Sequence, residues 1–220
     1  MSPAPLLEIK DLKVHFDTDE GVVKAVDGVS LAVHEGEMLG VVGESGSGKS
    51  VANLTILGLT RAANATITGR ITFEGEDLLQ IGEDELQRIR GNGISMIFQD
   101  PLSALHPFFK VGAQLIEAIQ VHQDVSDSAA RAHAVELLEL VGIPDAARRM
   151  GEYPHEFSGG QRQRVMIAMA LTNDPKLLIA DEPTTALDVT TQAQLQRLNE
   201  RLRHEHAKAH NLITHDLALN

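Results

Sequence analysis

The chain of 220 residues carries 31 acidic and 19 basic side chains, a formal charge of −12 that argues against nucleic acid as its main partner, because it would repel a phosphate backbone. With one Tyr, no Trp and six Phe it also lacks a stacking platform for single strands, and with no Cys it cannot form disulfides or thiolate metal sites. The longest apolar run, residues 165–171, is far shorter than the roughly 18 residues of a membrane span, so we expect one folded cytoplasmic unit with an insertion.

Two β-branched, partly alternating stretches open the chain, and a turn-prone segment at residues 17–21 separates them. Residues 6–16 and 22–33 therefore predict a hairpin or small antiparallel sheet. The apolar run 38–42, a Gly-rich loop and a helical stretch at 50–59 predict a buried strand, a loop and a helix. Further strands are expected at residues 71–73 and 94–98.

The pattern then becomes helical. Two prolines, Pro101 and Pro107, mark a loop, and helices are expected near residues 111–122 and 128–141. In the second helix an apolar face is formed by Ala134, Val135, Leu138 and Val141. After this insertion we expect a helix at 161–171, a strand at 177–180 and a helix at 190–204.

Strands that alternate with helices indicate an α/β fold with a mostly parallel sheet. The whole chain, residues 1–220, is predicted to be one domain in three parts. These are a β subdomain with a phosphate-loop core (1–100), a helical subdomain (101–160) and the remainder of the core (161–220).

A phosphate-binding loop is the strongest motif, because it fits G-x-x-x-x-G-K-[ST] and lies between an expected strand and an expected helix. Glycines let backbone N–H groups converge on phosphate oxygens, and the following helix adds its positive end. Lys49 would reach the β and γ phosphates of ATP, and the Ser50 hydroxyl would bind Mg²⁺. The alternative is a Gly-rich surface turn. The motif reads Gly43-Glu44-Ser45-Gly46-Ser47-Gly48-Lys49-Ser50.

Two carboxylates follow the apolar stretch at residues 177–180. At the carboxyl edge of a parallel sheet they would face a ligand crevice. Asp181 would then hold Mg²⁺, and Glu182 would polarise the water that attacks the γ-phosphate. Without the phosphate loop, a solvated acidic turn would be the better interpretation.

A second anion nest is indicated where Ser158 can cap a helix and two glycines follow it. In isolation, Ser158-Gly159-Gly160-Gln161 is typical of an ordinary capped helix start. Because the first loop already surrounds the phosphates of one nucleotide, a second nest suggests that the γ-phosphate is shared with another subunit.

Taken in order, these motifs resemble those of ABC ATPases. The resemblance implies a P-loop, RecA-like ATPase core with an N-terminal antiparallel β subdomain and an inserted α-helical subdomain. It also implies that Gln99 contacts Mg²⁺ and senses a permease, that Asp188 in Ala186-Leu187-Asp188 lies at the dimer interface, and that His215 contacts the γ-phosphate. Phe16 fits the aromatic residue on which adenine stacks, although a lone Phe is more often a core residue.

Several shorter sequence segments are similar to those of the ATPases of dipeptide, oligopeptide and nickel importers. These segments include Phe98-Gln99-Asp100-Pro101, Leu105-His106-Pro107 and Tyr153-Pro154-His155-Glu156-Phe157. The resemblance implies membrane permease subunits and a second ATPase subunit as partners, a solute-binding protein as an indirect one, no nucleic acid, and a peripheral location at the cytoplasmic face of the inner membrane.

The chain departs from the family pattern at three points. Phe157 occupies a position where family members carry Leu, and importer subunits continue through further strands beyond Asn220, so we expect the C-terminal part of the core to be missing here. Residues 204–211 are also polar where a buried strand should begin.

Other interpretations stay open. The chain could be a soluble ABC ATPase that acts on ribosomes or DNA, or a chain that binds ATP without hydrolysing it. Phe108 and Phe109 can line a groove for a permease helix or simply pack in the core. His206 and His210 stand four residues apart and could chelate a metal, although a solvated face is the simpler interpretation.

Overall fold

The computed structural model describes residues 4–44, 46–181 and 211–214. The chain divides into two compact units. The first comprises residues 1–90 and 211–220, and the second comprises residues 91–210. Within the described ranges, no helix is both long enough and apolar enough to cross a membrane.

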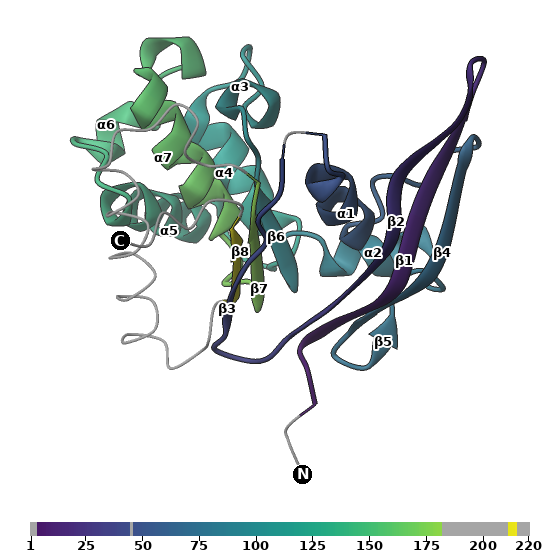
Figure 1. Ribbon diagram of the computed structural model, residues 1–220. Coiled ribbons are helices and arrows are strands. Elements are labelled where there is room, and N and C mark those ends of the chain that lie inside the picture. Colours follow the sequence, from purple (N-terminus) through teal and green to yellow (C-terminus); the bar gives the residue numbers. More distant parts are fainter. Residues whose placement is uncertain (1–3, 45, 182–210, 215–220) are drawn as a thin grey trace, which may run out of the picture. The chain divides into compact units, whose positions relative to one another are not determined.

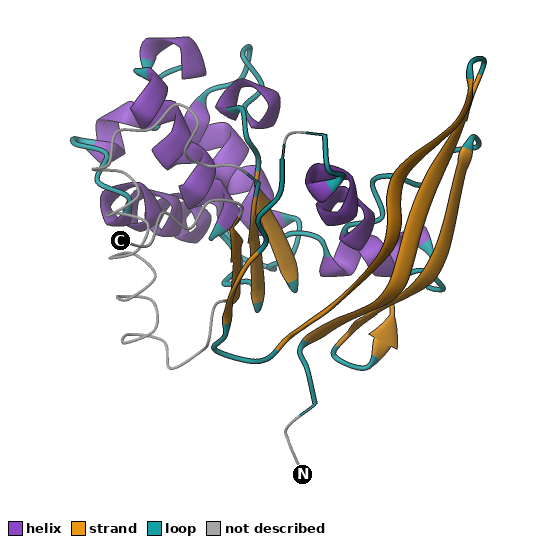
Figure 2. Cartoon of the chain, in the orientation of Figure 1, coloured by secondary structure: helices purple, strands orange, loops and turns teal. Residues whose placement is uncertain are grey.

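An antiparallel sheet dominates the first unit (Figure 2). Its order is β2 (Gly21–Val33), β1 (Leu7–Thr18), β4 (Ala65–Phe73) and β5 (Glu76–Asp77). The inner face of β1 is fully buried at Leu7, Ile9, Leu12 and Val14. The hairpin expected from the alternating pattern is confirmed, and β4 is longer than the three residues that the sequence indicated.

A β-bulge at Asp11 keeps the apolar residues of β1 on one face. Ile9 and Leu12 are an odd number of residues apart, so a regular strand would point them to opposite faces. The register shifts between them, Asp11 takes a left-handed φ of 46°, and its N–H donates to Ser30 Oγ at 2.9 Å. The neighbouring Gly69, at φ 100°, leaves no room for a side chain, because a Cβ would lie 2.4 Å from the Asp11 carbonyl oxygen.

The first unit also contains a parallel pair of short strands and two helices. β3 (Met38–Gly40) pairs with β8 (Asn211–Thr214), so the residues that follow the polar stretch do form a strand. The predicted buried strand 38–42 is wrong in length and burial, since β3 ends at Gly40 and both Met38 and Val42 are exposed. An apolar run shows where a strand can form, but tertiary neighbours decide whether it is covered.

Helix α1 (Lys49–Ile56) contacts β1 and β2. Helix α2 (Glu83–Ile89), which the sequence did not predict, is tied to the end of α1 by Arg90. The Arg90 guanidinium donates from Nε to the Leu57 carbonyl at 2.7 Å and forms an ion pair with Glu83. The hydrogen bond from Arg90 lowers the pKa of the Glu83 carboxyl.

The second unit is built on two parallel strands, β6 (Ile94–Ile97) and β7 (Leu177–Ala180), whose residues are all buried. Helix α7 (Gly159–Ala170) contacts β6 and three other helices. These are α3 (Pro101–Ala104), α4 (Val111–Gln120) and α5 (Asp127–Leu140). The described part of the unit also contains a short helix, α6 (Ala146–Arg149; Figure 1), and a 3-10 turn, η1 (Pro154–Glu156).

The predicted helices and strands of this unit are confirmed to within about two residues at most ends. On α5, Ala134 and Leu138 are fully buried as expected, Ala130 is fully buried too, Leu137 is 7% exposed, and Val135 is only half-buried. The helix expected at 190–204 lies outside the described residues. The α/β class is confirmed, and the three-part division of the chain stays a prediction.

Candidate functional site

The phosphate loop follows β3, and α1 begins at Lys49, as the motif requires. Gly48 sits at the N-cap with a left-handed φ of 88°. A Cβ at this position would lie 2.0 Å from the Ala25 carbonyl oxygen of β2, so only glycine lets the loop lie this close to the sheet. Gly46 is also left-handed, at φ 81°, but a Cβ there would meet nothing within 4 Å.

The Lys49 side chain turns back over the loop. Its Nζ donates to the Gly43 carbonyl, to the Glu44 carbonyl at 2.9 Å and to Ser47 Oγ at 3.3 Å. These acceptors hold the positive charge against the loop that precedes the first turn of α1. No side chain caps that turn among the described residues, and uncapped N–H groups beside a lysine ammonium suit an anion.

Phe16 lies in β1, in the same unit as the loop. It is directly opposite Val23 of β2, and it is half-buried rather than part of the closed core. Val23 is 51% exposed, which leaves an accessible apolar surface on the face of the sheet that it shares with Phe16. This surface suits the stacking role that the resemblance implies for Phe16.

In the second unit, the predicted metal residues follow two paired strands. Asp181 comes directly after β7 and is 6% exposed, and Gln99 follows the end of β6. The strands are parallel, Ile97 pairs with Ala180, and the Asp181 N–H donates to the Ile97 carbonyl at 2.9 Å. Both residues therefore belong to one edge of this strand pair. A carboxylate and an amide oxygen are ligands that suit Mg²⁺.

The second anion nest forms the start of α7. Ser158 is the N-cap: its Oγ accepts from the Gln161 N–H at 3.3 Å, and its own N–H donates to Gln161 Oε1 at 3.0 Å. Gly159 and Gly160 are exposed, and a Cβ at either one would meet nothing within 4 Å. The capping role predicted for Ser158 is confirmed, and the helix start is open to a ligand.

One contact beside this nest was not foreseen from the sequence. The Arg149 guanidinium carbon lies 5.2 Å from the ring centroid of the buried Phe157, in a cation–π arrangement. An aliphatic residue at 157, which the family pattern would supply, cannot make this contact. The only signal in the sequence was the phenylalanine at position 157, where family members carry leucine, because nothing in the spacing links positions 149 and 157.

Several predicted site residues lie outside the described part of the chain. They are Ser45 of the phosphate loop, Glu182, Asp188 and His215, together with the histidine pair His206 and His210.

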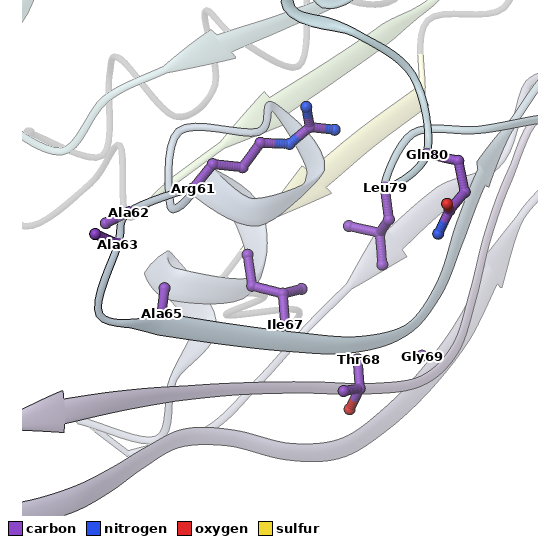
Figure 3. A pocket seen from close by; sticks show the side chains of 9 residues that line it. All are labelled: Arg61, Ala62, Ala63, Ala65, Ile67, Thr68, Gly69, Leu79 and Gln80. Atoms are coloured by element: carbon purple, nitrogen blue, oxygen red, sulfur yellow. The ribbon is translucent and has the colours of Figure 1, made fainter.

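A separate hollow of about 690 Å³ opens in the first unit (Figure 3). It is lined by residues 61–63, 65 and 67–69 on one side and by Leu79 and Gln80 on the other, and it includes no predicted site residue. The guanidinium of Arg61 at its rim donates to the Leu78 carbonyl at 2.6 Å and to the Ile81 carbonyl at 3.0 Å, so these donors hold backbone.

Comparison with known families gives a match over most of the chain: the sequence model of the ABC transporter family covers residues 26–185. The chain belongs to this family. Its ABC relatives include a putative peptide import ATP-binding protein of Brucella abortus, 51% identical over 219 residues. The oligopeptide transport ATP-binding protein OppD of Escherichia coli is 52% identical over 214 residues. The match spans 100% and 97% of this chain but only 66% and 63% of those relatives.

Solved ABC structures share the fold. The dimeric structure of MJ0796, a bacterial ABC transporter cassette, matches with a TM-score of 0.81 and 30% identity, covering 96% of this chain and 88% of that chain. The same values apply to a post-hydrolysis dimer of the MJ0796 ATP-binding cassette bound to ADP and Pi. The motifs predicted the fold of an ABC ATPase, and the match to these solved cassettes confirms that prediction.

Proposed function

We propose that the chain is the ATP-binding and ATP-hydrolysing part of an ABC importer that takes up dipeptides, oligopeptides or nickel through a membrane permease. The observation that supports this proposal is the phosphate loop, because the close approach of Gly48 to Ala25 and the position of Lys49 over the loop suit the binding of a triphosphate. The choice of peptides is supported by the relatives, which are named for peptide and oligopeptide import.

Each residue has a chemical task in this proposal. Lys49 neutralises the β and γ phosphates of ATP, and Ser50, Gln99 and Asp181 hold Mg²⁺. Mg²⁺ supplies charge neutralisation at the phosphates. Glu182 polarises the water that attacks the γ-phosphate, and His215 contacts the γ-phosphate. Phe16 stacks on adenine. Positioning and electrostatics then provide most of the rate enhancement.

A second ATPase subunit, identical or a paralogue, completes the nucleotide site. The exposed N-terminus of α7 at Ser158 binds the γ-phosphate of the nucleotide held by the partner's loop, and Asp188 lies at the interface between the subunits. The open space over Gly159 and Gly160 supports this role, because backbone N–H groups can approach an anion closely there. Binding of two ATP molecules closes the pair, and hydrolysis reopens it.

The permease binds the segment between α3 and α4, and a solute-binding protein delivers the solute to the permease. Phe108 and Phe109 of this segment are 81% and 57% exposed, so the alternative that both pack in the core is wrong. Two adjacent exposed phenyl rings are unusual on a surface and suit an apolar helix as their partner. The ATPase would then be peripheral, at the cytoplasmic face of the inner membrane.

Phosphate release tests the proposal. The purified protein should release phosphate from Mg-ATP, faster with its permease present. Glu182→Gln should keep ATP affinity and lower turnover by at least ~10²-fold, as expected for loss of a key catalytic group. Undiminished hydrolysis by Glu182→Gln would refute the role of Glu182. Binding without hydrolysis by the wild-type protein, with the permease present, would favour a non-hydrolysing chain instead.

A further inference from the structure

The two exposed rings stand on a short turn between α3 and α4. The Phe109 N–H donates to the His106 carbonyl at 3.4 Å, and the Phe108 N–H donates to His106 Nδ1 at 3.4 Å. The imidazole centroid lies 4.7 Å from the Phe109 ring and 5.9 Å from the Phe108 ring. These contacts are long and exposed, so they fix the turn only weakly by themselves.

A glutamine from the first turn of α4 holds this turn at both ends. Gln114 Oε1 accepts from the His106 N–H at 2.8 Å, and Gln114 Nε2 donates to the His106 carbonyl at 3.0 Å. The same Nε2 donates to the Phe109 carbonyl at 2.9 Å. The amide therefore uses its acceptor and both donors on the backbone of the residues that flank Phe108.

Gln114 does not act as a helix cap. The N-cap of α4 is Lys110, which makes no side-chain cap hydrogen bond, and the Gln114 side chain reaches back past it to the turn. A glutamine four residues into a helix is usually a solvated surface residue. Here its polar atoms are instead committed to backbone eight and five residues earlier in the chain.

The base that carries Gln114 is firmly held. The Val111 N–H donates to the Glu152 carbonyl at 2.9 Å, and the Gly112 N–H donates to the Met150 carbonyl at 3.0 Å. Val111 is fully buried, and a Cβ at Gly112 would lie 2.6 Å from the Met150 carbonyl oxygen. The start of α4 is thus seated on the 150–152 segment, and Gln114 projects from a fixed point.

We propose that Gln114 is a positioning residue that holds the Phe108–Phe109 turn in the conformation that binds the permease. The inference rests on the proposed function, because it takes the two rings as the permease contact. An exposed turn that had to become ordered on binding would lose affinity to that ordering, whereas a turn held in place beforehand does not. Gln114 supplies this order without touching the partner.

Three variants and one matched control test the inference. Gln114→Leu removes all three hydrogen bonds at similar side-chain size, and Gln114→Glu keeps the acceptor for the His106 N–H but loses both donors. Gln120→Leu is the control, because Gln120 lies on the same helix but donates to Asp127 Oδ1 at 2.8 Å, at the opposite end. The double variant Phe108→Ala, Phe109→Ala tests the docking surface itself.

Two measurements are needed. Amide hydrogen exchange of residues 105–109 reports the order of the turn. The affinity for the permease reports docking; the permease is identified by copurification with the wild-type protein and is then held in lipid nanodiscs. For Gln114→Leu we expect at least ~10-fold faster exchange at His106 and about 10-fold weaker permease binding, each equivalent to about 1.4 kcal/mol. Gln114→Glu should keep the His106 amide protected from exchange but still weaken permease binding. Gln120→Leu should match the wild type in both measurements. ATP affinity should be unchanged in Gln114→Leu, Gln114→Glu and Gln120→Leu.

The outcomes separate the inference from the proposed function. If Gln114→Leu speeds exchange but binds the permease as well as Gln120→Leu does, the positioning role is wrong while the docking surface survives. If the double Phe variant binds the permease like the wild type, the proposed docking surface is wrong. Should Gln114→Leu fail to fold, judged by circular dichroism, the comparison of Gln114→Glu with the wild type decides the question, and unchanged docking by Gln114→Glu overturns the inference.

Discussion

Replacing Gly48 with Ala should cost the protein far more than the same change at Gly46. Both glycines have left-handed φ values, 88° and 81°, so each alanine carries a backbone strain of about 1–2 kcal/mol. At Gly46 this strain is the whole effect, because a Cβ meets nothing within 4 Å. At Gly48 the Cβ would lie 2.0 Å from the Ala25 carbonyl oxygen of β2, so the loop or this strand must move. We expect Gly48→Ala to lose about 3 kcal/mol or more.

Equilibrium urea unfolding followed by circular dichroism measures both variants under identical conditions. Displacement of the loop should also abolish ATP binding at micromolar nucleotide in Gly48→Ala. Equal losses of stability in the two variants would refute the reasoning, because they would show that the close approach to Ala25 contributes nothing beyond backbone strain.

The remaining predictions concern the adenine-stacking role of Phe16 and the second anion nest at Ser158. Phe16→Ala should weaken ATP binding by about 10-fold, as for loss of one stacking contact, whereas Phe16→Tyr should bind ATP like the wild type. Fluorescence titration with a labelled nucleotide measures both affinities. If Phe16→Ala binds as tightly as the wild type, Phe16 is not part of the nucleotide site. Ser158→Ala should lose about 1 kcal/mol of stability with the helix cap and should also slow ATP hydrolysis. Its matched control is Ser126→Ala, since Ser126 Oγ caps α5 by accepting from the Ala129 N–H at the same 3.3 Å. This control should lose similar stability and keep full turnover, and equal turnover in the two variants would reduce Ser158 to a cap.

Local chemistry explains why much of the fold and of the site could be predicted from the sequence. The phosphate loop has fixed residue types at fixed spacing, and the helix does begin at Lys49. Ser158 was predicted to cap a helix, and its hydroxyl does so. The strand 177–180 was predicted from a short apolar run that ends in a carboxylate, and β7 has these bounds. In each case neighbours in the sequence determine the structure.

What the sequence left open depends on residues far apart in the chain. The close approach of Gly48 to Ala25 joins the loop to a strand 23 positions earlier, and no local pattern signals it. The bulge at Asp11 needs Gly69 of another strand. The hydrogen bonds of Gln114 and the contact between Arg149 and Phe157 arise from helix packing that periodicity does not specify. The exposure of Phe108 and Phe109 likewise required the structure, since a pair of phenylalanines is equally typical of a core.

ATP binding by Lys49→Ala is the most direct test of the central claim, that a triphosphate is bound by the loop after β3. Isothermal titration calorimetry with Mg-ATP, on the wild-type protein and on Lys49→Ala, requires neither the permease nor hydrolysis. The account predicts binding at micromolar ATP for the wild type and none in that range for the variant, because the variant lacks the cation that Gly43, Glu44 and Ser47 hold over the loop. An unchanged binding isotherm for Lys49→Ala would contradict it.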